Sequence, residues 1–347
     1  MEYGAIDLHT KRSQIRIVDA EGTVVVARKI DTTQAALTQV FSGRPGLRIL
    51  IESSTESEWV AQHLEGMGHE VIVADPNYAA MYGSRSRKVK TDSRDVAALA
   101  EANRTGVYRR AHRVSSRALR LRQTLRVRRH LVQLRSGTIS LLRSVLRREG
   151  LRLASGAADT ILARVDRLAI PDHVVTVIAP LRTLLTQVQA QLVEREAAVE
   201  AVAAADATTQ RLMTAPGVGP IVALTFQAVL DDPTRFGGDA RRASAFLGLV
   251  PSEDSSAERQ HKGHITKAGP PDLRALLVQA SWSIWRGRTA EGAALRTWAH
   301  ALAARRGRRI AIVALARRLS RILYAMWRDD EEFVTPSRSL VTVDVTA

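Results

Sequence analysis

The sequence contains no cysteine, few aromatic residues and no long apolar run. The absence of cysteine excludes disulfides, thiolate metal sites and thiol nucleophiles, so a bound metal must use oxygen or imidazole ligands. Aromatic residues make up 4% of the chain, which argues against base stacking as the chief mode of recognition. No stretch reaches the roughly 18 uncharged apolar residues that span a bilayer. We therefore expect a soluble cytoplasmic protein, with residues 310–327 forming an amphipathic helix.

Basic residues exceed acidic residues by a wide margin. Lysine and arginine together number 51 and aspartate and glutamate 35, so the formal net charge is +16. Such an excess repels itself unless an anionic partner offsets it, which favours a polyanion as the partner. The length of 347 residues suggests two or three domains with ordinary hydrophobic cores.

The first hundred residues alternate between strand-like and helix-like patterns. Apolar or alternating segments predict strands over residues 3–8, 14–18, 24–30, 47–51 and 70–74. Helical patterns cover residues 32–42 and 56–67, and turn residues at 19–22 suit a hairpin. Strands that begin antiparallel and continue through helical crossovers predict a mixed sheet with helices on its faces.

Residues 104–152 carry fifteen arginines and a single acidic residue, Glu149. Apolar residues recur on one three-and-four-spaced stripe, which predicts a long helix with a guanidinium-covered opposite face. An ordinary solvated helix face mixes charges of both signs, whereas this one does not, so we favour contact with nucleic acid. The residues expected to make this contact are Arg117, Arg120, Arg126, Arg128 and Arg129.

A second apolar stripe runs through residues 181–202. Its heptad spacing predicts either an antiparallel hairpin with the arginine-rich helix or a coiled coil between two chains. A compact α-helical segment is expected from about residue 207 to residue 328, followed by a frayed tail.

Four acidic residues stand at strand ends or at a helix start. Asp7 follows the first strand, Glu52 follows a buried strand, and Asp92 and Asp95 open a helix in the segment KTDSRD. Strand ends of an α/β sheet open onto one edge, and residues i and i+3 share a helix face, so the four carboxylates are expected to converge. Such a cluster suits two Mg²⁺ ions that act on a phosphodiester. Taken singly, each residue is also explained as a strand end or a helix cap.

Two further segments suggest contact with phosphate. Gly217 and Gly219 in APGVGP fit a helix-hairpin-helix turn, although a plain helical connection explains them equally. Residues 252–274 combine serines with a basic loop, and a serine there is a candidate nucleophile if cations stabilise the developing charge. Judged by residue type alone, these serines are ordinary turn formers. The basic residues expected to contact nucleic acid are Lys262, Lys267 and Arg274.

These motifs together resemble the DEDD transposases of the insertion-sequence 110 group, recombinases guided by a bridge RNA. The resemblance rests on AIDLH, IESS, the stretch from GHEVIVADP to TDSRDVAALA, PGVGP, and LGLVPSE through GHITKAG to LRALL. It implies a ribonuclease-H-like domain similar to the junction resolvase RuvC over residues 1–110 and an arginine-rich coiled-coil region over 111–206. It also implies an α-helical transposase domain over 207–330 and a tail over 331–347.

The resemblance also implies functional roles for individual residues. Asp7, Glu52, Asp92 and Asp95 would bind Mg²⁺, with Mn²⁺ as an alternative, and Ser256 would form a covalent phosphoserine link. Relatives usually carry glycine after that serine, whereas Ala257 follows here, so Ser255 stays an alternative nucleophile. The implied partners are donor DNA, target DNA, a noncoding bridge RNA and further copies of the chain in a dimer or tetramer.

Three other functions stay open from the sequence. A RuvC-like junction nuclease would hydrolyse DNA with carboxylates and metal and form no covalent link. A non-catalytic nucleic-acid scaffold would use the acidic cluster structurally. An actin-like ATPase shares the first strands, but it explains neither the arginine-rich helix nor the absence of phosphate-binding loops.

Overall fold

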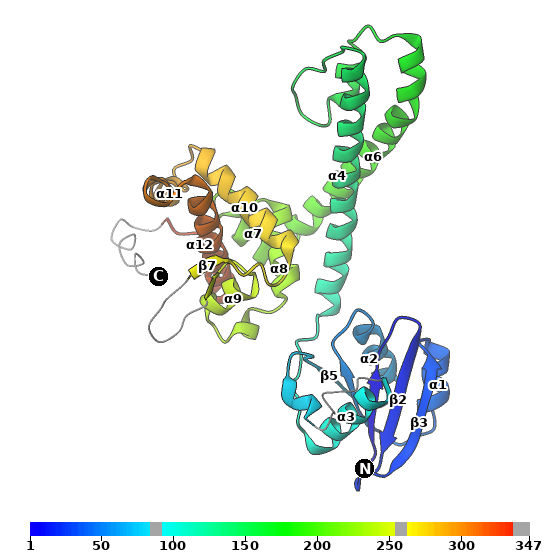
Figure 1. Cartoon of the computed structure of the whole chain (residues 1–347). Helices are drawn as coiled ribbons and strands as arrows, with labels where there is room; N and C mark the ends of the chain where they lie inside the picture. The colour runs from blue at the N-terminus through cyan, green and yellow to red at the C-terminus, as the bar shows by residue number, and fades with distance from the viewer. Residues whose placement is uncertain (84–91, 254–261, 336–347) are drawn as a thin grey trace. The chain divides into compact units, whose positions relative to one another are not determined.

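The computed structural model describes residues 1–83, 92–253 and 262–335, and the chain divides into two compact units, Met1–Val114 and Ser115–Ala347 (Figure 1). The first unit is a mixed α/β domain, and the second is mainly helical. Within the described residues, no helix is both long enough and apolar enough to cross a membrane.

The first unit is built on a five-stranded sheet of order β3-β2-β1-β4-β5. Strand β1 pairs antiparallel with β2 and parallel with β4, so the sheet is mixed as the sequence predicts. Most element boundaries lie within one or two residues of the expected ones, and β2 begins two residues earlier than expected. The elements are β1 (Tyr3–Asp7), β2 (Arg12–Val18), β3 (Val24–Asp31), α1 (Gln34–Phe41), β4 (Arg48–Glu52), α2 (Ser57–Gly66), β5 (Glu70–Ala74), η1 (Ala79–Tyr82) and α3 (Asp92–Thr105).

The two faces of this sheet bury separate apolar clusters. One face carries Ile6, Ile49 and Ile51, which pack with residues of α1 and α2. The other face carries Ala5 and Leu50, which pack with residues of α3. Because successive strand residues point to opposite faces, this division also determines the face on which the last residue of each strand lies.

The arginines that precede the long helix belong to the first unit, which corrects the expectation of one continuous helix from Arg104. Helix α3 ends at Thr105, and the chain then lies against the edge of β5, where the amide of Ala111 donates a 2.8 Å hydrogen bond to the carbonyl of Val73. Arg113 donates hydrogen bonds to both Glu58 and Glu65. The other early arginines also pair with acidic residues of this unit, namely Arg104 with Glu101, Arg109 with Asp75 and Arg110 with Glu70.

The second unit begins with a helical hairpin. Ser115 caps α4 (Ser116–Arg148), its hydroxyl accepting a 3.1 Å hydrogen bond from the amide of Ala118. Helix α5 (Ile161–Val165) lies in the connection to α6 (Asp172–Ala204), and α4 and α6 run antiparallel and pack together (Figure 1). Leu142 and Leu146 of α4 share a buried cluster with Ile178 of α6. An antiparallel hairpin within one chain therefore accounts for the two apolar stripes.

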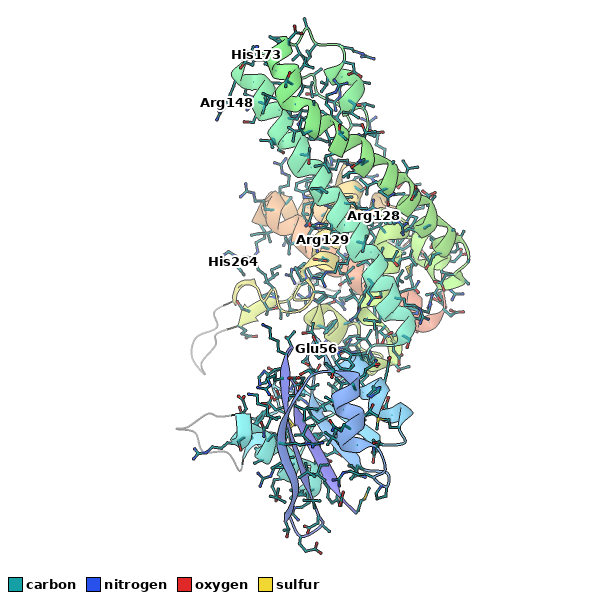
Figure 2. The ribbon with its side chains drawn as sticks, turned by 90° about the vertical axis from the view of Figure 1, so that its right-hand side faces the viewer. Glu56, Arg128, Arg129, Arg148, His173 and His264 are labelled. Carbon is teal, nitrogen blue, oxygen red and sulfur yellow. The ribbon has the colours of Figure 1, made fainter. Side chains whose placement is uncertain are left out.

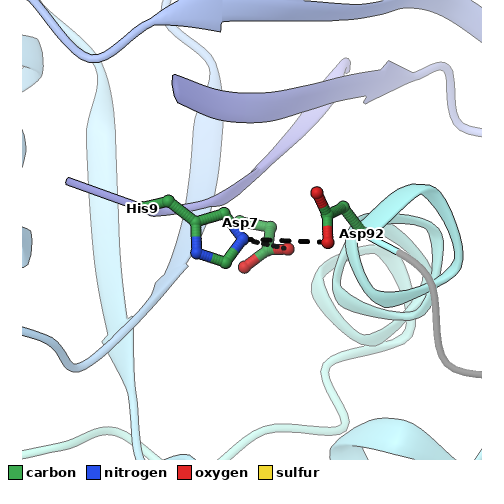
Figure 3. Close-up of side chains that lie close together, drawn as sticks. All are labelled: Asp7, His9 and Asp92. Atoms are coloured by element: carbon green, nitrogen blue, oxygen red, sulfur yellow. Dashed lines mark ion pairs between the residues drawn. The ribbon is translucent and has the colours of Figure 1, made fainter. Parts of the chain in front are cut away.

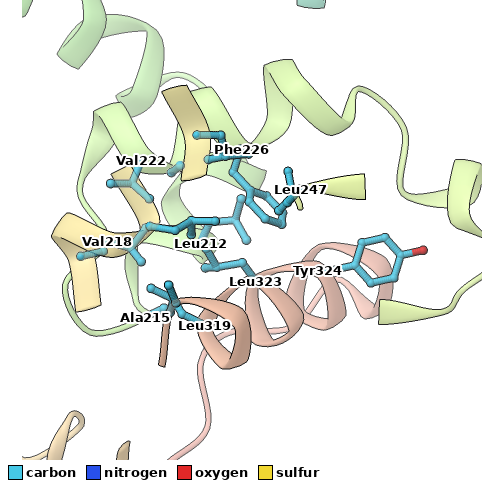
Figure 4. Packing of buried hydrophobic residues seen from close by; sticks show 14 of the residues in the cluster. Leu212, Ala215, Val218, Val222, Phe226, Leu247, Leu319, Leu323 and Tyr324 are labelled. Atoms are coloured by element: carbon cyan, nitrogen blue, oxygen red, sulfur yellow. The ribbon is translucent and has the colours of Figure 1, made fainter. Parts of the chain in front are cut away.

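The remaining helices enclose one large apolar core in which Phe226, Leu247, Leu323 and Tyr324 are buried (Figure 4). The sequence predicted an all-helical segment here, but the structure adds a short antiparallel hairpin of β6 and β7. The elements are α7 (Ala207–Met213), α8 (Pro220–Leu230), η2 (Pro233–Phe236), α9 (Ala240–Phe246), β6 (Pro251–Glu253), β7 (Lys262–Ile265), α10 (Pro271–Arg286), α11 (Ala293–Arg306) and α12 (Arg308–Asp329).

Candidate functional site

The acidic residues predicted from the sequence share one face of the sheet in the first unit. Asp7 lies two residues after Ala5, and Glu52 lies two residues after Leu50, so strand alternation puts both on the face that α3 covers. Ile6 pairs with Ile51 in the parallel ladder, so Asp7 and Glu52 are the next residues on neighbouring strands.

Asp7 and Asp92 approach each other through an unpredicted residue, His9. The Nε2 atom of His9 lies 3.4 Å from Oδ2 of Asp7 and 3.9 Å from Oδ1 of Asp92 (Figure 3). One ligand atom from each of the three residues lies within 4.8 Å of the other two. Among the described residues, Asp7, His9 and Asp92 form the one group of three histidine or acidic side chains that could hold a metal ion.

The electrostatics around Asp7 are those of a site with an excess of negative charge. Burial raises the pKa of Asp7 above its ordinary value of 3.8, and the negative charges of Asp92 and Asp95 raise it further, whereas His9 lowers it. Only 12% of the Asp7 side chain is exposed, so solvent screens these charges poorly. An ionised Asp7 is therefore costly in the isolated protein, and a bound cation would remove that cost.

Lys29 supplies a positive charge on the opposite side of Asp92. Asp7 pairs with Gln14 on β2, and Gln14 pairs with Lys29 on β3, so the three residues form one row across the sheet. The Lys29 ammonium donates a 3.2 Å hydrogen bond to Oδ2 of Asp92, which lowers the pKa of Asp92. Asp92 is therefore a carboxylate of the cluster that the protein itself neutralises.

The other two predicted carboxylates lie near this cluster but outside the group of three. Asp95 is buried one turn along α3 from Asp92, and its charge acts on Asp7. Glu52 is half-buried at the end of β4, beside the end of β1. The structure therefore brings Asp7 and Asp92 together directly and places Asp95 and Glu52 around them.

The predicted nucleophiles, Ser255 and Ser256, lie outside the described residues, but the β6–β7 hairpin on either side of them in the sequence is described. Its base is tightly built. The amide of Thr266 donates a 2.9 Å hydrogen bond to Val250, and the Arg274 guanidinium donates hydrogen bonds to the carbonyls of Leu247 and Ala268. Arg274, predicted to contact nucleic acid, thus holds the base of the hairpin.

Two glycines allow the strands at this base to approach closely. Gly248 and Gly269 both have a positive φ, and a Cβ atom on either would collide with a backbone carbonyl oxygen, that of Ala268 or that of Phe246. Lys267, two residues before Gly269, is exposed and also has a positive φ of 54°. Lys262 lies in β7.

The PGVGP turn connects α7 and α8. Gly217 has a φ of 75°, and a Cβ atom there would lie 2.7 Å from the carbonyl oxygen of Ala280 on α10. This close approach gives Gly217 a packing role irrespective of any phosphate contact. Gly219 precedes the first turn of α8, and a Cβ atom there would meet no neighbouring atom within 4 Å.

The arginines of α4 fall into two sets. Several arginines of the first half are already paired: Arg117 with Asp206, Arg128 with Glu196 and Arg129 with Asp272. Arg120 and Arg126 are exposed and form no ion pair in the described part of the chain. Figure 2 shows Arg128 and Arg129 along α4, and Arg148 near the far end of the hairpin.

The far end of the helical hairpin carries guanidinium groups without acidic partners. Arg143, Arg147 and Arg152 line a cavity of about 380 Å³ together with Leu151 and Leu153. None of the three arginines forms an ion pair with a described residue, and the Nε atom of Arg143 is buried without a hydrogen-bond acceptor. Since unpaired guanidinium groups bind phosphate readily, this end is the stronger candidate for contact with nucleic acid.

Comparison with known proteins agrees with these features. The profile of the "Transposase IS116/IS110/IS902 family" matches residues 209–295, and the DEDD profile described as "Transposase" matches residues 5–149. The chain is 28% identical to a protein of Pseudomonas aeruginosa named "Probable family 20 transposase", over 92% of this chain and 95% of that protein. It is 27% identical to the transposase for insertion sequence element IS1111A of Coxiella burnetii, over 94% of this chain and 90% of that protein.

The fold, the carboxylate cluster and these matches define a transposase, an enzyme that cleaves and rejoins DNA strands. The chain belongs to the IS116/IS110/IS902 family, which confirms the resemblance drawn from its motifs. A DEDD transposase domain implies the use of a divalent metal, and the cluster fits one, because oxygen and imidazole donors converge where negative charge is in excess.

Proposed function

We propose that this transposase exchanges DNA strands through a covalent phosphoserine intermediate, with Mg²⁺ held by Asp7, Glu52, Asp92 and Asp95. The observation that carries the proposal is the approach of Asp7 and Asp92 at the end of β1, with Asp95 close enough to raise the pKa of Asp7. A bound divalent ion would polarise the scissile phosphate. The carboxylates would hold that ion at the end of β1, where it would orient the phosphate.

The proposed nucleophile is the hydroxyl of Ser256. Its oxygen attacks phosphorus, a bond from phosphorus to a sugar oxygen breaks, and a proton passes to that leaving oxygen. A hydroxyl of the second DNA strand then attacks the phosphoserine, which restores the serine. A covalent link conserves the phosphodiester bond energy, so no nucleotide cofactor is needed.

We further propose that base pairing with a bridge RNA selects the donor and target DNA, so the protein need only bind phosphates and helical shape. The unpaired arginines Arg143, Arg147 and Arg152 support contact with a polyanion. Arg120 and Arg126, both exposed, support the same role along α4. Assembly as a dimer or tetramer would bring two DNA duplexes together.

A denaturing gel tests the covalent step. Wild-type protein with its co-purified RNA, incubated with donor DNA and Mg²⁺, should yield a protein–DNA adduct, and Ser256→Ala should abolish the adduct while RNA and DNA binding stay intact. Ser252→Ala is the matched control, because the Ser252 hydroxyl donates a 3.0 Å hydrogen bond to His264 within the β6–β7 hairpin. An adduct that persists in Ser256→Ala and disappears in Ser255→Ala would transfer the role to Ser255.

A junction nuclease without a covalent intermediate is the second candidate, since the carboxylate cluster alone provides for metal-dependent hydrolysis. Free 5′-phosphate ends with no attached protein would favour it. Sequencing the nucleic acid that co-purifies with the protein tests guidance separately. One discrete noncoding RNA is expected, and its absence from active protein would contradict the guide.

A further inference from the structure

His9 is the residue of the cluster to which neither the family comparison nor the sequence motifs assign a role. It follows β1, and its Nε2 atom lies between carboxylate oxygens of Asp7 and Asp92, at 3.4 Å and 3.9 Å. Two ligand atoms at about 2.0–2.2 Å from a common ion are separated by no more than roughly 4.4 Å. Both distances fall within this span, and all three ligand atoms lie within 4.8 Å of one another, so small side-chain rotations would bring the imidazole and both carboxylates to one ion.

We propose that His9 is a direct nitrogen ligand of the divalent ion and biases this site toward Mn²⁺ over Mg²⁺. The proposal rests on the metal site of the proposed function and adds to it the identity of one ligand and a consequence for metal choice. Figure 3 shows the imidazole beside both carboxylates, with its ring nitrogen directed at them.

Charge balance favours an imidazole at this position. Asp7 already experiences the negative charges of Asp92 and Asp95, which raise its pKa. Another carboxylate would increase this repulsion, whereas neutral imidazole adds a donor atom without adding charge. The side chain of His9 is 52% exposed, so it can turn toward an arriving ion without disturbing the core.

The nature of the donor atom determines the metal preference. Oxygen ligands suit Mg²⁺ and Mn²⁺ alike, whereas imidazole nitrogen binds transition metals better than Mg²⁺. A site with one nitrogen and several carboxylate oxygens therefore discriminates between the two ions more strongly than a site with oxygens only. The alternative is that His9 only donates a hydrogen bond to Asp7 and never contacts the ion.

Pulsed electron paramagnetic resonance of bound Mn²⁺ separates direct ligation from a hydrogen bond. Full-length protein is stripped with chelator and loaded with Mn²⁺ alone, and modulation from directly bound ¹⁴N is measured. We expect this signal in the wild type, its loss in His9→Ala and in His9→Asn, and its retention in His63→Ala. His63 is the matched control because it lies on α2 of the same unit and hydrogen-bonds to Thr38.

Calorimetry with Mn²⁺ and with Mg²⁺ measures the preference itself. His9→Ala should weaken Mn²⁺ binding by at least about tenfold, the lower bound seen for changes to the surroundings of metal ligands. Mg²⁺ binding should weaken less, so the ratio of the two dissociation constants should move toward one. An unchanged ratio would contradict the proposed preference.

The outcomes distinguish this inference from the proposed function. Bound Mn²⁺ without ¹⁴N modulation in the wild type would overturn ligation by His9 and leave the carboxylate site standing. Modulation that persists in His9→Ala would overturn it as well. Failure of Mn²⁺ to bind the wild type would overturn both this inference and the proposed metal site.

Discussion

Lys29 and Asp92 form an ion pair across 63 positions of the sequence, with the lysine ammonium donating a 3.2 Å hydrogen bond to the carboxylate. The lysine reaches Asp92 from β3, at the edge of the sheet. Asp92 belongs to the same cluster as Asp7 and His9, and its other oxygen, Oδ1, faces His9, so the lysine neutralises a carboxylate that a metal ion would use. Lys29 and the metal therefore compete for Asp92.

Removal of this lysine should tighten metal binding. We expect Lys29→Gln to increase the affinity for Mn²⁺ about two- to fivefold at low salt, the range that follows from the energy of an exposed ion pair. Arg28→Gln is the matched control, because it makes the same change of charge on the neighbouring residue of β3, which points to the opposite face of the sheet. Calorimetry at two salt concentrations measures the effect, and equal affinities for the two variants would refute the competition.

Replacement of Asp7 should stabilise the metal-free protein. The raised pKa means that folding disfavours the ionised carboxylate, so stability falls as the pH rises from the ordinary value of 3.8 through the folded-state pKa. We therefore expect Asp7→Asn to increase the melting temperature at pH 7 in chelator, and the gain to vanish below the ordinary pKa. Thermal denaturation across this pH range tests the sign.

Metal should reverse that order of stability. A ligand that binds only the folded state stabilises it, and Asp7→Asn loses a carboxylate oxygen of the site. We expect saturating Mn²⁺ to raise the melting temperature of the wild type more than that of Asp7→Asn. Equal increases for the two proteins would show that Asp7 does not contribute to metal binding.

The element order of the first unit could be predicted from the sequence because each strand shows its own apolar pattern. The same apolar patterns show where each strand ends, so Asp7 and Glu52 could be placed at the edge of the sheet and predicted as neighbours. His9 could have been found, since its spacing of two from Asp7 puts both on one side of an extended chain. Lys29 could not, because its contact depends on the pairing of three strands.

The arginine-rich helix shows the limit of composition as a guide. A run of positive charges suggests that the protein binds a polyanion. The acidic residues that pair with such a helix are distant in the sequence, so the sequence alone does not identify them. Arg117 pairs with Asp206, 89 positions away, and Arg128 pairs with Glu196, 68 positions away. The sequence therefore predicted the helix that forms α4 but not its start at Ser116, and it could not separate the paired arginines from the unpaired ones.

The arginines without ion pairs at the far end of the helical hairpin should contribute more to nucleic-acid binding than the ion-paired arginines of α4. Replacing Arg143, Arg147 and Arg152 by alanine should weaken nucleic-acid binding strongly. The slope of log K against log salt concentration should become shallower by about one unit for each lost phosphate contact. Alanine at the paired residues Arg117, Arg128 and Arg129 should change the slope less, because their charges are already balanced within the protein. Filter binding between 50 and 200 mM salt measures both variants, and equal slopes would contradict the division.

The base of the β6–β7 hairpin should tolerate no side chain at Gly248. Its φ of 67° is left-handed, which costs about 1–3 kcal/mol for most residues, and a Cβ atom would also strike the carbonyl of Ala268. We expect Gly248→Ala to lower the free energy of unfolding by at least this amount and to reduce formation of the protein–DNA adduct.

Gly137→Ala is the matched control for this substitution. Gly137 lies inside α4, and a Cβ atom there meets no neighbouring atom within 4 Å. Alanine in a helix interior should stabilise the protein by about 0.5–1 kcal/mol, so the two glycine variants should change stability in opposite directions. Denaturant unfolding provides the comparison. If Gly248→Ala unfolds at the same denaturant concentration as the wild type, the close approach of Gly248 to the Ala268 backbone is not what stabilises the hairpin base.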